Sequence, residues 1–437
     1  MSIEAIREQI ASRPLRPLQV LVIALGVLVN MVDGLDLLAA SIVSPILVRE
    51  WGLAPQSLGW LLGAGLAGTA VGALLLSPIA DLLGRRTSIL VNLAFMTVGM
   101  LASALADSVL ELTVLRFLTG MGVGAMASCV GTLVFEYCSH KTRNLGLGLV
   151  TIGYNVGVVI GGVVSMWIID LYGWRSIFVF GGLCTAALMP LVHFLLPESI
   201  DFMVARPRHN TLPQLNRILQ RLELPQLAAL PTPPAARASA SPLDLLREPL
   251  RPRLLLMMLA YLLYMLSSYF FMNWNNQLTV EAGATDAAGR LVVTLTNVGG
   301  IVGGIVIGAL TLRLPLRAVA TVTLVAMAAT IVLFGAAAHS YPLAVLASVL
   351  TGFGIFGGAV ALYATGAATY PAHVRATGMG LSMTAGRFGA FLGPILAGYL
   401  LAAGAGRWWT CLVLAVPVAL SALALVRVPL EPLPDGR

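Results

Sequence analysis

Long apolar runs alternate with short polar breaks along almost the whole chain. A helix needs about 20 apolar residues to cross a hydrocarbon core of roughly 30 Å, and each run is near that length or longer. The pattern predicts twelve membrane-spanning helices, near residues 18–40, 57–80, 87–106, 109–134, 144–170, 175–196, 253–278, 288–311, 316–337, 341–369, 376–402 and 406–427. The predicted fold class is therefore an all-α integral membrane protein.

A polar stretch in the middle of the chain separates two sets of six spans. Hydropathy falls between Pro197 and Arg253, and this stretch contains Pro231-Thr-Pro-Pro-Ala-Ala-Arg237. The pattern predicts an N-terminal segment (1–17), a six-helix bundle (18–196), a linker (197–252), a second six-helix bundle (253–427) and a short tail (428–437).

Short motifs recur between the two halves at an offset of 232 residues. Leu118-Thr-Gly-Met-Gly122 recurs as Leu350-Thr-Gly-Phe-Gly354, and Arg143-Asn-Leu-Gly-Leu-Gly-Leu149 recurs as Arg375-Ala-Thr-Gly-Met-Gly-Leu381. Glycines match at the same offset, Gly72 with Gly304, Gly157 with Gly389 and Gly161 with Gly393. These matches predict two pseudo-symmetric bundles with a solute site near the midplane between them. We interpret the glycines as close-packing positions rather than solute contacts.

Composition and charge place the chain in a membrane and set its orientation. Hydrophobic residues make up 58% of the chain and charged residues 10%, and the mean hydropathy is +0.91. A net charge of +7 is also found in nucleic-acid-binding proteins, but 20 of the 26 Lys and Arg lie on one side of the predicted membrane. By the positive-inside rule, both termini are expected in the cytoplasm, under a bacterial-type inner membrane. No nucleic-acid partner is expected.

Sites of other classes find little support. The four cysteines lie in or at the ends of apolar runs without paired spacing, which argues against a disulfide framework or a zinc site. Catalytic signatures such as His-Glu-x-x-His, a phosphate-binding loop or Gly-x-Ser-x-Gly are absent from the spans. We therefore expect no enzyme activity, cofactor or metal. The first apolar run is not followed by a small-residue cleavage site, so it is predicted to be retained.

Two carboxylates lie inside the first predicted span. Asp33 and Asp36 are three residues apart and share a helical face with Asn30. Ionisable groups in a membrane are costly, and desolvation and repulsion favour protonation of at least one carboxylate of such a pair. The pair is the candidate proton-coupling site, and Asn30 a candidate substrate contact. The alternative is a helix-packing pair. At the 232-residue offset their counterparts are Met265 and Ser268, so the acidic pair belongs to one half only.

Two arginines also lie within predicted spans. Arg116 is near one end of the fourth span and Arg387 near the middle of the eleventh. Arginine stays protonated, and its planar fork of donors fits a carboxylate. We predict that Arg387 binds a solute carboxylate, with a structural or coupling pair as the alternative. For Arg116, a partnership with Asp33 or Asp36 is preferred over direct substrate contact.

The seventh predicted span is rich in aromatic side chains that can stack on an aromatic solute. With polar residues of other spans, they give a set of candidate substrate contacts: Tyr154, Asn155, Tyr264, Tyr269, Asn273, Asn297 and Tyr363. Each has an alternative role in bridging helices or in the interfacial aromatic belt. The run Asn275-Asn276-Gln277 is expected near a helix end, in contact with solvent.

Several motifs resemble those of the major facilitator superfamily. Ser77-Pro-Ile-Ala-Asp81-Leu-Leu-Gly84-Arg85-Arg86 is similar to its signature between helices 2 and 3, although Ser77 stands where glycine is usual. Arg116-Phe-Leu-Thr-Gly120-Met-Gly-Val-Gly124, Glu136 with Arg143, and Pro197-Glu198-Ser199 resemble further motifs of the family. The resemblance implies gating or conformational roles for Asp81, Gly84, Arg85, Arg86, Glu136, Arg143 and the repeat position Arg375.

Two further motifs resemble the aromatic acid:proton symporter family. They are Asp33-Gly-Leu-Asp36 with Ser44-Pro45, and Gly386-Arg387-Phe-Gly389 with Gly393-Pro394. The resemblance implies a monomeric secondary transporter that imports benzoate-, hydroxybenzoate- or phenylpropionate-like carboxylates with protons by alternating access.

Other carriers of the same fold remain as alternatives. A symporter of a non-aromatic organic acid would use the same arginine. A proton-driven drug or metabolite exporter fits less well, because Gly161-Gly162 stands where antiporter signatures have Gly-Pro. A neutral sugar would give Arg387 no charge to bind. A sensor that keeps the fold would bind a solute without accumulating it.

Overall fold

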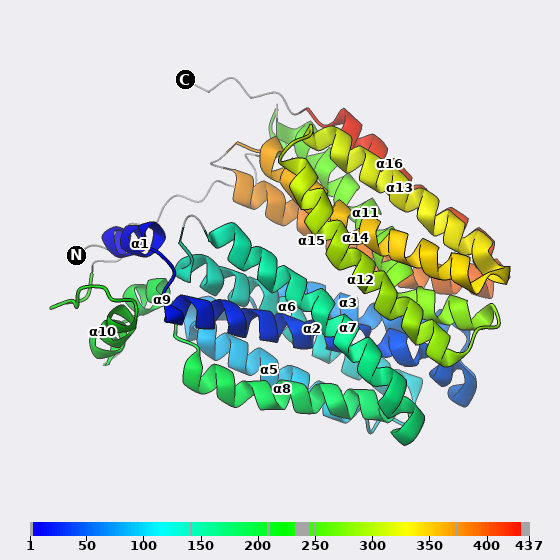
Figure 1. Cartoon of the computed structure of the whole chain (residues 1–437), viewed down its shortest axis with the longest axis horizontal. Coiled ribbons are helices and arrows are strands. Elements are labelled where there is room, and N and C mark those ends of the chain that lie inside the picture. The colour runs from blue at the N-terminus through cyan, green and yellow to red at the C-terminus, as the bar shows by residue number, and fades with distance from the viewer. Residues whose placement is uncertain are drawn as a thin grey trace.

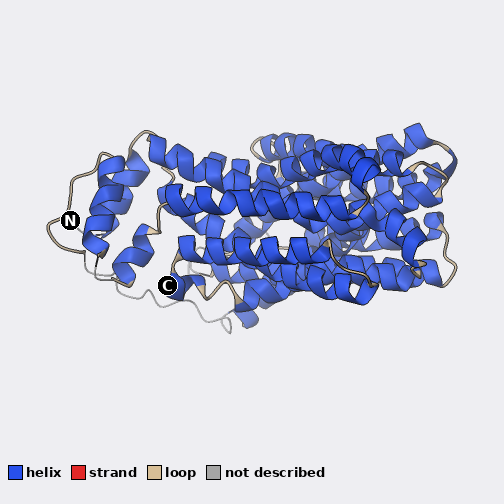
Figure 2. Ribbon diagram, turned by 90° about the horizontal axis from the view of Figure 1, so that it is seen from below, coloured by secondary structure: helices blue, strands red, loops and turns tan. Residues whose placement is uncertain are grey.

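The computed structural model describes residues 3–139, 142–207, 210–231, 245–248, 250–371 and 374–429, and these residues form helices and loops without a strand. Twelve helices are long and apolar enough to cross a membrane, which confirms the predicted number. They are α2 (Pro17–Trp51), α3 (Pro55–Leu75), α5 (Arg85–Ser103), α6 (Val109–Tyr137), α7 (Arg143–Tyr172), α8 (Arg175–Leu195), α11 (Leu250–Glu281), α12 (Asp286–Thr311), α13 (Leu316–Ala336), α14 (Tyr341–Thr369), α15 (Arg375–Ala402) and α16 (Arg407–Arg427). They run lengthwise in two bundles (Figures 1 and 2).

The first span is longer than its pattern predicts. The prediction ended at residue 40, but α2 continues through Pro45 to Trp51. A proline inside a helix deprives the carbonyl four residues earlier of its N–H donor. In this protein the Ser41 carbonyl accepts hydrogen bonds from the Ser44 hydroxyl and the Asn276 amide instead, so the helix continues.

The two bundles repeat one packing scheme. In the first, α2 packs on α7, α3 packs on α6, and α5 packs on both α6 and α8. In the second, α11 packs on α15, α12 packs on α14, and α13 packs on both α14 and α16. Each helix of the second set follows its counterpart in chain order, so the fold consists of two pseudo-symmetric six-helix bundles.

The repeat has two offsets rather than one. A Cβ on Gly72 would overlap the carbonyl oxygen of Met121, and a Cβ on Gly303 would overlap that of Phe353. Met121 and Phe353 are 232 residues apart, whereas the two glycines are 231 apart, so the predicted match of Gly72 with Gly304 is wrong by one residue. One residue fewer separates α3 from α12 than α6 from α14.

Contacts between the bundles gather at one end. We define the linker end as the end where α2 begins and where the short helices α1 (Ile3–Ser12), α9 (Ile200–Ala205) and α10 (Thr211–Arg221) lie (Figure 1). The loop end is opposite, where α2 ends. The bundles meet through α3 on α15, α7 on α12 and α2 on α11. Their polar contacts join Trp60 with Tyr399, Ser41 with Asn273, Asn276 with Ser41 and Ile42, Arg290 with Asp170, Arg49 with Asp286, and Arg387 with Thr69. All but the last lie toward the loop end, so the protein is closed there.

The linker end of the first bundle carries a small helical cluster that the hydropathy pattern did not predict. Ile6 and Ile10 of α1 belong to the same buried cluster as Leu215 and Leu219 of α10. Arg7 pairs with Asp201 of α9 at 2.7 Å, and this hydrogen bond raises the pKa of Arg7. The start of the chain and the start of the linker are thereby bound to the first bundle.

Candidate functional site

A buried ion pair forms the centre of the candidate site. Asp36 of α2 accepts a hydrogen bond from Nη1 of Arg116 on α6 at 2.8 Å, and both side chains are less than 5% exposed. The arginine also donates to the hydroxyls of Ser103 and Thr119, at 2.7 and 3.1 Å. Its guanidinium lies over the Phe178 ring, 4.9 Å from the centroid. Arg116 is thus held by one helix of charge and three of neutral partners, which compensates its burial.

Asp33 lies one turn away in a different environment. Its side chain is 2% exposed, and Oδ1 is buried without a hydrogen-bond partner. The hydroxyl of Tyr154 on α7 is also buried without a partner and lies within electrostatic range of both Asp33 and Asp36. A carboxylate without a compensating cation is expensive to ionise inside a membrane. The helical face predicted from sequence therefore holds one paired and one unpaired carboxylate.

Arg387 lies at the contact between the bundles. It projects from α15, is half-buried, and donates through Nη1 to the backbone carbonyl of Thr69 on α3 at 2.7 Å. Tyr269 of α11 is within electrostatic range of it. Within the described residues no carboxylate comes to ion-pair distance of this guanidinium. Because a backbone carbonyl does not neutralise a charge, Arg387 keeps its capacity to bind an anion.

The remaining predicted contacts divide into two groups. Asn30, Asn273 and Asn297 donate their side-chain amides to backbone carbonyls, of Val150, Tyr269 and Val293 respectively. The Tyr264 hydroxyl donates to the Ile355 carbonyl on α14. These bonds join or brace helices. Oxygen atoms of Asn155 and Asn297 stay buried without partners and so remain able to accept a hydrogen bond. Tyr363 is 59% exposed and is near Tyr261 rather than the acidic pair.

The signature loop after α3 is held by a residue that the sequence reasoning did not single out. Asp81 pairs with Arg85 at 2.7 Å within the loop and the start of α5. The first N–H groups of α5 are instead bound by Glu198, whose Oε1 accepts from the backbone nitrogens of Arg85 and Arg86 at 2.7 and 3.1 Å. A carboxylate at a helix N-terminus is favoured by the helix dipole.

Gly84 explains why Glu198 can approach so closely. Its φ of 98° is in the region that favours glycine, and a Cβ there would overlap the Glu198 carboxylate. The guanidinium of Arg86 donates to the His193 carbonyl at the end of α8. The signature loop is therefore fastened to the segment after α8. The sequence signal was present in the motif Pro197-Glu198-Ser199, but the cap itself depends on three-dimensional proximity.

The other predicted conformational residues lie at the linker end. Arg143 lies over the Phe135 ring, 3.9 Å from its centroid, and makes no ion pair with Glu136 among the described residues. Glu136 is near the Ser199 hydroxyl instead. Arg375 is exposed and donates to the Tyr370 carbonyl at 3.3 Å. Burial raises the pKa of the Tyr370 hydroxyl, which lies 3.0 Å from the Ser382 hydroxyl.

The site therefore combines three functional groups from helices that belong to both bundles. One is a neutralised ion pair, one a buried carboxylate with a free oxygen, and one a cation with a free face beside a phenol. A small cavity borders the ion pair and is also lined by Leu61, Gly65 and Gly120. Within the described ranges, no cluster of three His, Cys, Asp or Glu side chains could hold a metal ion. The arrangement suits binding of an anion and transfer of a proton.

Comparisons with known proteins agree in kind with this geometry. The family model of the Major Facilitator Superfamily matches residues 26–274 and 257–437. The gallate transporter of Pseudomonas putida is 32% identical over 96% of this chain and 94% of its own length. The 4-hydroxybenzoate transporter PcaK of Acinetobacter baylyi is 30% identical over 94% of this chain and 91% of its own. A crystal structure of a D-xylose-proton symporter superposes with a TM-score of 0.72 at 14% identity, over 94% of this chain and 97% of the other.

Proposed function

Because this chain belongs to the major facilitator superfamily, we propose that it is a proton-coupled secondary transporter that imports a small aromatic carboxylate by alternating access. Relatives that match it over nearly its full length are named for gallate, 4-hydroxybenzoate, benzoate and 3-(3-hydroxy-phenyl)propionate. These solutes share an aromatic ring and a carboxylate, which are the two features that the site is equipped to recognise.

The observation that carries the proposal is the free cation between the bundles. Arg387 is charged, half-buried and without a carboxylate partner among the described residues, and Tyr269 lies close to it. A solute carboxylate can bind the free face of the guanidinium while its ring lies against the phenol. Since the arginine projects from one bundle and touches the other, a bound anion would be sensed by both.

The second part of the proposal assigns the proton to the acidic pair. Asp36 is neutralised by Arg116, so Asp33 is the carboxylate that gains most from protonation. We assign proton loading to Asp33, supported by Asp36 and Arg116. The Tyr154 hydroxyl provides a hydrogen-bonding group on the side of the neighbouring helix.

The orientation follows from the distribution of basic residues. The linker end is placed in the cytoplasm of a bacterial-type inner membrane, because 20 of the 26 Lys and Arg belong to that side or to the chain ends predicted there. Closure at the loop end then corresponds to an inward-facing state. The transporter is proposed to work as a monomer, since each bundle interface that the site needs lies within one chain.

Thermal unfolding of the purified full-length protein with a panel of acids tests the substrate class. Benzoate, 4-hydroxybenzoate and gallate should raise the unfolding temperature, because a ligand that binds the folded state stabilises it by mass action. Succinate and shikimate serve as non-aromatic acids, and xylose as a neutral solute. Stabilisation by succinate or shikimate alone would assign a non-aromatic acid instead. Uptake into proteoliposomes against a concentration gradient then separates a carrier from a sensor.

A further inference from the structure

A proline in α2 creates a polar attachment point at the loop end. Pro45 has no N–H, so the Ser41 carbonyl lacks its usual helical donor. The Ser44 hydroxyl takes one side of this oxygen at 2.8 Å. Asn276 of α11, in the other bundle, donates its amide to the Ser41 carbonyl and to the Ile42 carbonyl, both at 2.8 Å. One side chain of the second bundle therefore binds two backbone groups of the first.

The attachment is reciprocal and closely fitted. The Ser41 hydroxyl donates back to the Asn273 carbonyl on α11 at 2.8 Å. Asn276 is fully buried, although its position near a helix end predicted contact with solvent. On its other side lies Gly289 of α12, where a Cβ would overlap Oδ1 of the amide. Only glycine leaves room for the amide between α2 and α12.

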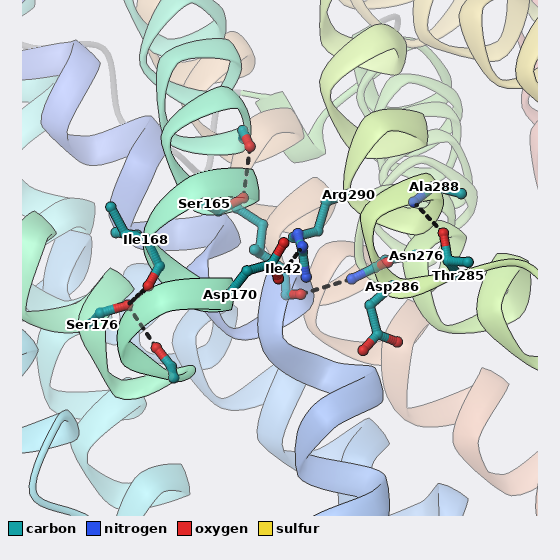
Figure 3. A network of polar contacts seen from close by, with 12 residues as sticks. Ile42, Ser165, Ile168, Asp170, Ser176, Asn276, Thr285, Asp286, Ala288 and Arg290 are labelled. Carbon is teal, nitrogen blue, oxygen red and sulfur yellow. Dashed lines mark hydrogen bonds and ion pairs between the residues drawn. The ribbon is translucent and has the colours of Figure 1, made fainter.

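Two ion pairs flank this contact and also join the bundles. Arg290 of α12 donates to Asp170 of α7 at 2.8 Å, and its side chain is 2% exposed (Figure 3). Arg49 at the end of α2 pairs with Asp286 at the start of α12, with one bond of 2.9 Å. Figure 3 shows Asn276 directed at Ile42 between the Arg290 and Asp286 side chains. The three contacts span the seam between the bundles.

We propose that Asn276 is the principal latch of the outer gate: its amide holds the backbone that Pro45 leaves free in α2, and this tie must break before substrate can enter from the loop end. The inference rests on the transport cycle proposed above. Polar side chains bonded across membrane helices contribute modestly, so such a latch can open and close during each cycle. The exposed ends of the two ion pairs, at Asp170 and Arg49, give water a place from which to compete for them.

Distance measurements between spin labels test the latch without any substrate. The labels are placed at Tyr172→Cys and Ala403→Cys, exposed positions at the loop ends of the two bundles, in full-length protein whose four native cysteines are replaced by alanine. With Asn276 intact, one short-distance population should dominate. Asn276→Ala should raise the ratio of long to short distances roughly fivefold, as expected for the loss of two interhelical hydrogen bonds.

Two further variants make the test specific. Gln277→Ala removes a neighbouring buried amide whose 2.9 Å bond goes to Glu281 of the same helix, so it should leave the distances unchanged. Pro45→Ala restores an N–H donor for the Ser41 carbonyl, so it should shift the distances in the same direction as Asn276→Ala. If Asn276→Ala yields too little folded protein, Pro45→Ala carries the test.

Each outcome decides for or against the latch. Unchanged distances in both Asn276→Ala and Pro45→Ala overturn the proposal, as does an equal shift in Gln277→Ala, which would indicate loss of packing. Because the distances are measured without solute, failure to transport aromatic acids would refute the proposed function and leave the latch result standing.

Discussion

Asp33 and Asp36 share one face of α2, yet their surroundings divide the work between them. Asp36 is bound to Arg116, while Oδ1 of Asp33 is buried without a partner. Their spacing alone predicts a common face, and it does so because a helix repeats every 3.6 residues. It cannot tell which of the two meets the arginine of α6, since that depends on how α2 is rotated against α6.

Replacing Asp36 should damage the fold more than replacing an exposed acid. Asp36→Asn leaves the Arg116 charge buried without its counter-ion, which typically costs about 3 kcal/mol or more. The double variant Asp36→Asn with Arg116→Gln removes both charges and should recover much of the loss. Thermal unfolding of the purified variants measures both effects. Asp107→Asn, on a loop and exposed, is the control and should unfold like the wild type.

Arg387 gives the clearest prediction for substrate binding. Arg387→Ala should weaken binding of the most stabilising aromatic acid about thirtyfold, equivalent to roughly 2 kcal/mol for a hydrogen-bonded charge. Arg387→Lys keeps the charge but loses the planar fork, so its loss should be smaller. Titration calorimetry measures both. Arg251→Ala removes an exposed arginine at the start of α11 and should bind normally. Equal affinity in Arg387→Ala and wild type would exclude this arginine from the binding site.

At the scale of helices, glycine sets how closely the elements approach. A Cβ on Gly157 of α7 would overlap the Met31 carbonyl of α2, whereas a Cβ on Gly148 of the same helix would meet nothing within 4 Å. Both glycines look alike in the sequence. The recurrence of Gly157 as Gly389 distinguishes it, and a Cβ on Gly389 would overlap the Leu262 carbonyl of α11 in the same way.

This difference predicts opposite effects for one substitution at two places on α7. Gly157→Ala must push α7 away from α2, and it should lower the unfolding temperature by several degrees, as for a strained core substitution costing 1–3 kcal/mol. Gly148→Ala fills open space and improves helix propensity, so it should be neutral or slightly stabilising. Thermal unfolding in detergent compares them. Equal unfolding temperatures for the two variants would mean that α7 can move away from α2 without cost.

The helical pairing also corrects the repeat on which the sequence interpretation relied. Gly157 packs on Met31 and Gly389 on Leu262, which places the α2 and α11 counterparts 231 residues apart. The counterparts of Asp33 and Asp36 are therefore Tyr264 and Ser267, not Met265 and Ser268. The conclusion that the acidic pair belongs to one half is unaffected. Offsets read from α6 and α7 could not reveal a residue missing earlier in the repeat.

At the scale of the whole molecule, the sequence predicts the architecture but not the state. Twelve apolar runs, a polar linker and the glycine repeat suffice for two bundles, because lipid requires helices to satisfy their own backbone bonds. Which end is closed depends on contacts such as Asn276 with the Ser41 carbonyl, and these form only in some arrangements of the two bundles. Local patterns carry no information on that choice.

Charge balance across the whole site predicts electroneutral transport. Arg116 and Asp36 cancel, so the site offers one free cation, Arg387, for one carboxylate and one unpaired acid, Asp33, for one proton. A monoanion that moves with one proton carries no net charge. In proteoliposomes, an imposed pH gradient, acidic on the side from which solute enters, should drive accumulation, and a potassium diffusion potential alone should not. Asp33→Asn should lose accumulation driven by the pH gradient but keep exchange of labelled for unlabelled solute, because the amide preserves shape without titrating. Uptake that responds to the diffusion potential would require a second proton, and wild-type accumulation in Asp33→Asn would remove this carboxylate from the coupling mechanism.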